Sequence, residues 1–262
     1  MNATRYCMTR FQTTIYCVKK GEDGRKKEGA PMRFGLRKLT LLDYPEKVAC
    51  TVFTCGCNFR CPFCHNPALV TGSEEALEYS FADVLAFLET RRDRLDAVCI
   101  TGGEPLLHEE SGLLAEAAKG MGYLVKLDTN GSLPARLKAL VDAGSVDYVA
   151  MDIKNAPEKY AATCGIEHWE PVRESAEYLL SGPVAYEFRT TVTGNLHEAA
   201  DFVSIGRWLA GAKRYYLQGF RDSGAILGGD AAPFAVSEEQ LRSFLAAVKP
   251  FIPAAEIRGV DL

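Results

Sequence analysis

An α/β fold, an incomplete (β/α)6 barrel, is the architecture that the sequence predicts. Two patterns indicate it: short β-branched or apolar runs alternate with amphipathic segments after Met32, and polar residues follow the ends of successive runs. Six or seven β/α units fit into the chain of 262 residues. That number falls short of the eight units that close a TIM barrel, so a partial, TIM-like barrel is expected.

Each predicted strand is a short run rich in apolar and β-branched residues. In chain order, strands are expected at 48–53, 97–101, 123–128, 148–152, 185–192 and 213–218, with a short last strand at 256–257. Helices are expected between them at 81–90, 113–119, 134–142, 172–180, 197–210 and 238–247. Ser80 precedes the first helix as an N-cap. Four helices are followed by a glycine, the usual stop signal: Gly120, Gly144, Gly182 and Gly211.

The chain is expected to divide into a leader at 1–31 and one barrel domain at 32–262. The leader holds seven Lys or Arg against three Asp or Glu and shows no sustained periodicity, so it is predicted to be a flexible, basic segment. The alternative is that translation begins at Met32, which would make the leader an artefact of start-site choice.

Composition excludes several classes of protein. The net charge of −4 gives no basic field for nucleic acid, and no apolar run approaches the roughly 20 residues that span a bilayer. Nine cysteines, four of them within ten residues, do not form the spacing of a disulfide framework. A reducing, cytoplasmic setting is therefore expected, without a membrane or nucleic-acid partner.

Cys57, Cys61 and Cys64 form a C-x3-C-x2-C motif just after the first predicted strand. Three thiolates can hold three irons of a [4Fe–4S] cluster and leave the fourth iron open, whereas an electron carrier or a structural zinc site needs four ligands. Cys55 could in principle be the fourth, but it lies only two residues from Cys57, too close for easy closure. Phe63 precedes the last cysteine and is expected to shield the cluster and to offer apolar surface to a base.

Polar residues at the other predicted strand ends are expected to meet the cysteines at one mouth of the barrel. The candidates are Gly102, Gly103, Glu104, Pro105, Asp128, Asn130, Asp152, Lys154, Arg189 and Gln218. The plainer alternatives are a glycine turn, a turn at Asn130, and a solvated Lys154. Arg189 lies within a strand, where a charge is costly without a partner, so a carboxylate clamp is its natural use. His65 either shields a cluster or caps a turn, and the other histidines are interpreted as structural or exposed.

Taken together, five segments give the chain a resemblance to the radical SAM superfamily, and within it to the activating proteins of anaerobic ribonucleoside-triphosphate reductase of the longer type, which are similar to pyruvate formate-lyase activating enzyme. The segments are FGLRKLTLLDYP at 34–45, CNFRCPFCHNP at 57–67, KLDTNGS at 126–132, VAMDIK at 149–154 and YEFRTTV at 186–192. Cys55 departs from the pattern, where a Gln is expected, and the leader has no counterpart.

The resemblance implies a set of roles. Cys57, Cys61 and Cys64 would bind the [4Fe–4S] cluster, and the loop 102–105 would hold the amino group of S-adenosylmethionine. Phe63, Asp128, Asn130, Lys154 and Arg189 would line the cavity for this cofactor and the substrate. A glycyl-radical enzyme would be the protein substrate, with flavodoxin or ferredoxin as electron donor.

Alternative functions stay open at this point. A pyruvate formate-lyase type activase, or a radical SAM enzyme that acts on a small molecule, would share the same core motifs. The gap of about 37 residues between Cys64 and Gly102 has no room for a ferredoxin-like insert, which favours the reductase or formate-lyase type. An iron–sulfur carrier or zinc module would require full ligation by protein.

Overall fold

The computed structural model describes residues 32–71, 77–222 and 224–259, so the prediction for the leader at 1–31 lies outside the described residues. The described strands form one nine-stranded sheet in the order β3-β1-β2-β4-β5-β6-β7-β8-β9. Their bounds are β1 Arg33–Thr40, β2 Ala49–Thr54, β3 Tyr79–Ser80, β4 Ala97–Gly102, β5 Leu124–Thr129, β6 Tyr148–Asp152, β7 Ala185–Val192, β8 Tyr215–Gly219 and β9 Ala255–Arg258. Neighbours from β2 to β9 are parallel, and β1 is antiparallel to both β2 and β3.

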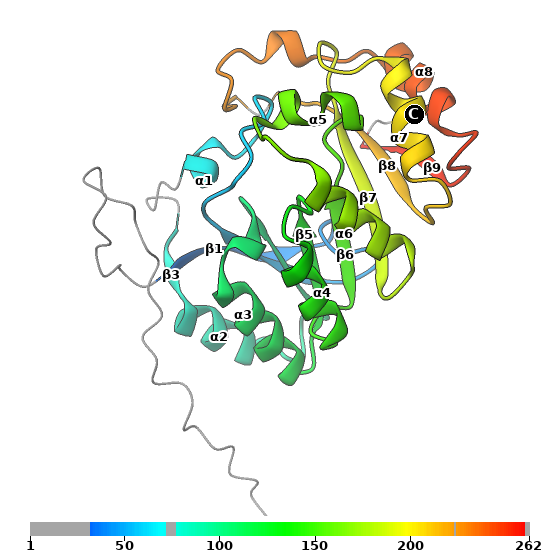
Figure 1. The fold of residues 1–262 in the computed structure, drawn as a ribbon. Helices are drawn as coiled ribbons and strands as arrows, with labels where there is room; N and C mark the ends of the chain where they lie inside the picture. Colours follow the sequence, from blue (N-terminus) through cyan, green and yellow to red (C-terminus); the bar gives the residue numbers. More distant parts are fainter. Residues whose placement is uncertain (1–31, 72–76, 223, 260–262) are drawn as a thin grey trace, which may run out of the picture.

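The helices lie on the outside of this curved sheet (Figure 1). Their bounds are α1 Pro67–Thr71, α2 Phe81–Glu89, α3 Glu109–Gly120, α4 Pro134–Asp142, α5 Pro157–Cys164, α6 Glu170–Leu180, α7 Ala199–Trp208 and α8 Glu238–Val248. Within the described residues, seven strands are parallel, and a helix follows each of the first six, β2, β4, β5, β6, β7 and β8, before the next parallel strand. The predicted incomplete (β/α)6 barrel is confirmed. None of the described helices combines the length and apolar character that crossing a bilayer requires.

The expected elements are present, with small shifts at their ends. The strands β6 and β7 have the predicted bounds, and Ser80 caps α2 through a reciprocal pair of hydrogen bonds with Asp83. One stop signal was wrong: α3 runs through Gly120, and Gly122 takes the left-handed φ of +92° instead. The elements β1, β3, α1 and α5 were not predicted.

The positions of the charged side chains of the site follow from the alternation along each strand and from the pairing between neighbouring strands. Residues two apart on a strand share a face, so Lys126 and Asp128 lie on the same side of β5. Asp152 at the end of β6 is directly opposite Arg189 on β7. The intervening apolar residues, such as Leu127 and Phe188, are buried in the core on the other face. Alternation along the strands therefore sends charge into the barrel and apolar side chains toward the helices.

Candidate functional site

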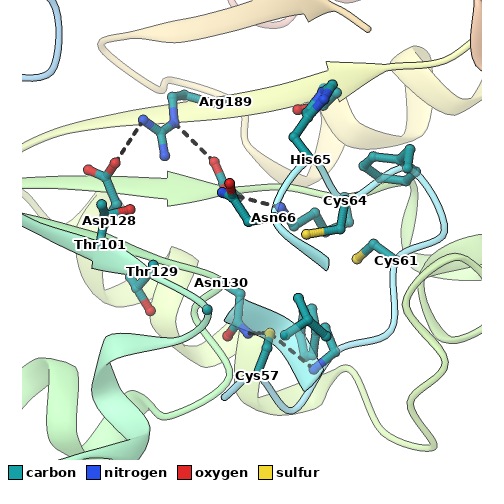
Figure 2. Close-up of a pocket in the computed structure, with 18 of the residues that line it drawn as sticks. Cys57, Cys61, Cys64, His65, Asn66, Thr101, Asp128, Thr129, Asn130 and Arg189 are labelled. Atoms are coloured by element: carbon teal, nitrogen blue, oxygen red, sulfur yellow. Dashed lines mark hydrogen bonds and ion pairs between the residues drawn. The ribbon is translucent and has the colours of Figure 1, made fainter. Parts of the chain in front are cut away.

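A cavity of about 510 Å³ lies where the parallel strands end, within the size range of small-molecule sites. Figure 2 shows its labelled side chains reaching in from the cysteine loop and from neighbouring strands. Of the predicted site residues, the lining includes Cys57, Cys61, Phe63, Cys64, Gly102, Gly103, Asp128, Asn130, Lys154 and Arg189, together with Asp152 and Gln218. The structure thus brings nearly the whole predicted set together, apart from Glu104 and Pro105.

The cysteine loop is fixed by backbone hydrogen bonds to three other segments. Gly56 N donates to Leu69 O at 2.6 Å, and Gly56 O accepts from Glu104 N at 2.8 Å. Arg60 N donates to the carbonyl of Cys164, at the end of α5, at 2.7 Å. Phe59 is buried between the cysteines and packs edge-on against Tyr160. With the apolar residues turned into the core, the loop presents its thiols to the cavity.

The three thiols differ in their surroundings. Burial raises the pKa of Cys57 and of Cys64, because it penalises the thiolate. The pKa of Cys61 is lowered, first by a hydrogen bond from the thiol of Cys164, whose own pKa burial raises. The Asn130 amide Nδ2 lies 3.9 Å from the Cys57 Sγ and also donates to Asn58 Oδ1 at 2.9 Å. Cys57 therefore has a polar neighbour from the end of β5.

Cys55 is placed away from the triplet. It is 8% exposed and packs with Leu69 and Leu77 in a small apolar cluster, and it does not line the cavity. Its carbonyl oxygen lies 2.6 Å from His108 Nε2. His108 thus has the structural role expected of it, and so has His197, whose Nε2 lies 3.0 Å from the carbonyl oxygen of Lys154.

Gly102 and Gly103 allow the end of β4 to touch the cysteine loop. Gly102 has a φ of +132°, and a Cβ there would overlap the backbone of Thr54. A Cβ on Gly103 would overlap the carbonyl of Gly56, and Gly103 N donates to Thr54 O at 3.0 Å. The two glycines therefore serve close backbone packing as well as lining the cavity.

Glu104 points away from the cavity, and its carboxylate ties the loop after β4 to the end of β5 through hydrogen bonds. Its carboxylate is fully buried and accepts hydrogen bonds from Leu106 N at 3.0 Å, Thr129 Oγ1 at 2.8 Å and Asn130 N at 2.7 Å. Burial raises its pKa to about 7, against the opposing effect of these three donors. Pro105 begins the short 3-10 turn Pro105–Leu107 and is buried. Both residues support the site without lining it.

Replacing Glu104 by Gln is expected to change how stability depends on pH. A carboxyl whose pKa rises from 4.5 to about 7 on folding stabilises the native state fully below pH 4.5. This contribution, about 3 kcal/mol, is lost as pH rises to 7. The wild-type free energy of unfolding should therefore fall between pH 4.5 and 7 relative to Glu104→Gln, as measured by urea titration of the metal-free chain. Parallel pH profiles for the two proteins would contradict this assignment.

Five charged side chains form an alternating row, in which Asp128, Arg189, Asp152 and Lys154 line the cavity and Lys126 is buried next to Asp128. Figure 2 labels Asp128 and Arg189 and marks the ion pair between them. Lys126 Nζ lies 2.5 Å from Asp128 Oδ1, and Arg189 Nη1 lies 3.3 Å from the other oxygen of Asp128. Arg189 Nε continues to Asp152 Oδ1 at 2.9 Å, and Lys154 Nζ ends the row 3.0 Å from Asp152 Oδ2. Three cations and two anions leave a net charge of +1 in this row.

For Asp152, Lys154 and Arg189, the neighbouring charges change the pKa more than burial does. Burial alone would raise the pKa of Asp152, but the Arg189 guanidinium and the Lys154 ammonium lower it to about 2. In the same way, burial would lower the pKa of Lys154 and Arg189, and the neighbouring carboxylates raise both. All three groups are therefore charged at neutral pH. A row with a surplus cation can receive an anionic group of a ligand.

Some lining residues were not singled out from the sequence. Thr191 lies two residues after Arg189 on the same face of β7, so the strand period could have indicated it. Asp43 comes from the turn between β1 and β2, where no periodicity points to it. His65, in contrast, was singled out, as shielding a cluster or capping a turn; it lines the cavity and stacks on Phe220, with ring centroids 5.0 Å apart.

The family comparison matches residues 51–194, more than half of the chain, to the radical SAM superfamily. The chain belongs to this superfamily. Membership in the radical SAM superfamily implies a [4Fe–4S] cluster and S-adenosylmethionine. The donor set fits, because the cavity is lined by three thiols and by no other cysteine of the described residues. In the described part of the chain, no three Cys, His, Asp or Glu side chains lie close enough together to bind a single metal ion. A [4Fe–4S] cluster does not require this, because each thiolate binds a separate iron.

Two curated relatives show the similarity at the level of sequence. "Putative glycyl-radical enzyme activating enzyme MJ1227" of Methanocaldococcus jannaschii is 29% identical over 235 residues, which cover 87% of this chain and 95% of the relative. A 7-carboxy-7-deazaguanine synthase of Aquifex aeolicus is 40% identical, but over 81 residues only, 30% of this chain and 34% of that enzyme.

A solved structure supports the fold. SuiB of Streptococcus suis, bound to S-adenosylmethionine, superposes with a TM-score of 0.59 over 78% of this chain at 13% identity. This radical SAM chain spans about half of SuiB, 48% of its length. At that identity the likeness concerns the fold alone.

Proposed function

We propose that this radical SAM enzyme is an activating enzyme that installs a glycyl radical on a partner protein, and that the partner is an anaerobic ribonucleoside-triphosphate reductase. The observation that carries the proposal is the alignment with the Methanocaldococcus jannaschii relative, because it covers 95% of that protein and 87% of this chain. The five sequence segments that resemble reductase activating proteins support the choice of partner.

In this proposal Cys57, Cys61 and Cys64 hold the [4Fe–4S] cluster. When bound and reduced, the cluster supplies one electron that splits S-adenosylmethionine into methionine and a 5′-deoxyadenosyl radical. The cavity-facing backbone of Gly102 and Gly103 receives the amino group. Phe63, 3% exposed at the cavity wall, offers apolar surface to the adenine.

The charged row binds the carboxylate end of the cofactor and keeps the ligand in one orientation. Lys154 ends the row beside the cysteine loop, and its charge acts on Cys57, Cys61 and Cys64. Asn130 joins β5 to the loop through Asn58. The residues of this chain thus orient the cofactor, while the glycine Cα of the partner gives up a hydrogen atom and becomes the radical.

The test is the formation of a glycyl radical. Anaerobically reconstituted protein, reduced by flavodoxin or ferredoxin and mixed with S-adenosylmethionine and the reductase, is expected to give a doublet glycyl signal by electron paramagnetic resonance. Methionine and 5′-deoxyadenosine should form at about one equivalent per radical, because each cleavage creates one radical. A reductase whose acceptor glycine is replaced by alanine is the matched control and should give no signal.

A second candidate is a radical SAM enzyme that acts on a small molecule. The 40% identity over 81 residues to a 7-carboxy-7-deazaguanine synthase favours it, although the match covers only 30% of this chain. Cleavage of S-adenosylmethionine without a radical on any glycyl-radical enzyme, together with alteration of a small metabolite, would replace the first candidate by this one.

A further inference from the structure

Three exposed leucines lie close together in the sequence, Leu39 near the end of β1 and Leu41 and Leu42 on the connection to β2. Leu39, Leu41 and Leu42 are 60%, 68% and 91% exposed. Among the described residues, only Leu113 on α3 joins them as an exposed large hydrophobic side chain, at 36%. Single exposed leucines are ordinary, but three on one turn mark an interaction surface. We call residues 39–42 the leucine turn.

The leucine turn is held in place from inside the barrel. Thr40 Oγ1 accepts hydrogen bonds from Leu42 N at 3.2 Å and from Asp43 N at 3.3 Å. The Asp43 carboxylate in turn accepts a hydrogen bond from Thr51 on β2. The ring of Tyr44, only 7% exposed, lies 5.9 Å from that of Tyr148. Since the residues beside them are anchored, the leucines are presented on a fixed turn, and their exposure does not result from a loose loop.

The leucine turn also adjoins the cavity at the open edge of the sheet. Asp43, the next residue, lines the cavity. The strand β3 pairs only with Arg33 and Phe34, so β1 is the edge strand from Gly35 up to the turn. The other end of the strand order is β9, which leaves the barrel unclosed between them. The register pairs Thr40 with Ala49, so the leucine turn lies at the start of β2 and the cysteine loop follows its end. A segment that runs along the opening to the cysteine loop would pass the leucines.

The charged side chains around the leucine turn indicate what kind of surface on a partner protein would bind there. Arg37, Lys38 and Lys47 are exposed beside the leucines, but Arg37 lies 3.5 Å from the Asp43 carboxylate, which leaves Lys38 and Lys47 against one exposed acid, Glu46. The chain as a whole is acidic, with a net charge of −4, so this is a local excess of positive charge. A complementary surface is therefore apolar in its centre and carboxylate-rich at its rim.

We propose that the leucine turn is the docking surface for the polypeptide substrate, through an apolar patch flanked by Asp or Glu on that protein. This inference rests on the proposed function, because it requires a macromolecular substrate. The patch is too small for a stable complex by itself, so it raises the affinity of a transient encounter. Its loss should raise the KM for the partner protein and leave the cleavage of S-adenosylmethionine unchanged.

The experiment compares Leu41→Ser/Leu42→Ser with the wild type, and Leu113→Ser serves as the matched control on α3. With the purified anaerobic reductase as substrate, the double variant is expected to raise the KM for radical installation by about tenfold. Formation of 5′-deoxyadenosine without the reductase, with dithionite as reductant, should be equal in all three proteins. Lys38→Glu/Lys47→Glu should raise the same KM and weaken its dependence on salt.

The outcomes separate this proposal from the proposed function. If the wild type installs the radical and the double variant does so with an unchanged KM, the docking surface is overturned while the function stands. If the wild type cleaves S-adenosylmethionine but no glycyl-radical enzyme acquires a radical, the function fails and the docking proposal fails with it. A wild-type dimer that the leucine substitutions convert to a monomer in sedimentation would assign the turn to a second copy of this chain and overturn the proposal.

Discussion

Replacement of Cys57, Cys61 or Cys64 by Ala is expected to abolish the cleavage of S-adenosylmethionine. In the proposed three-ligand cluster each thiolate would hold a separate iron, so no remaining ligand could take over the lost position. The measurement is 5′-deoxyadenosine formed by reconstituted protein under reduction, together with the iron content and the electron paramagnetic resonance spectrum of the reduced cluster. We expect no detectable product and a lost or altered cluster signal in all three variants.

Two other buried cysteines provide matched controls. Cys55 packs in its own apolar cluster, and Cys164 is fully buried at the end of α5, and neither lines the cavity. Cys55→Ala should keep both cluster and activity. Cys164→Ala should keep the cluster, although Cys61 loses a hydrogen bond. Loss of the cluster in Cys55→Ala, with retention in Cys57→Ala, would sink the assignment of the ligands.

The second large effect is expected for Arg189→Met, which removes the central cation of the charged row. Asp128 and Asp152 would then lose their shared partner inside the barrel. Each carboxylate keeps one lysine partner, Lys126 for Asp128 and Lys154 for Asp152, so the cost is that of losing hydrogen bonds to a buried charged group, about 1–3 kcal/mol. We expect a loss of this size in the free energy of unfolding by urea titration, and weaker binding of S-adenosylmethionine by calorimetry.

Arg189→Lys tests whether geometry or charge matters. Lysine keeps the positive charge but cannot bridge two carboxylates with a planar fork, so its effect should lie between wild type and Arg189→Met. If both variants unfold at the same urea concentration as the wild type, the row does not stabilise the fold. If stability falls and ligand affinity does not, Arg189 serves the barrel alone.

The ends of strands were predicted best where turn residues flank the apolar run on both sides. β6 and β7 had the predicted bounds, since their apolar runs are flanked by clear breaks. β1 was missed because its burial pattern is irregular and four of its eight residues are exposed, as suits an edge strand. α5 carries signals that could have found it: Pro157 at its first turn and Gly165 with a φ of +66° just after its end.

The site residues on strands could be predicted from the sequence, because the period of two along a strand determines toward which face each side chain points. Arg189 and Asp128 are on barrel-facing positions because side chains alternate along a strand. Glu104 shows the limit of this reasoning. In a turn the direction of a side chain depends on distant partners, here Thr129 and Asn130, and these turn the carboxylate away from the cavity. The residues next to Glu104 in the sequence therefore do not predict the direction of its side chain.

The row from Lys126 to Lys154 holds three cations and two anions, and this surplus of one positive charge affects which ligands the cavity can bind. A ligand with one carboxylate brings the row to neutrality. A decarboxylated analogue of the same shape would leave the surplus cation of the row without its anion in a partly buried cavity, which is costly. We therefore expect the net charge of a ligand, as well as its outline, to decide how tightly it binds.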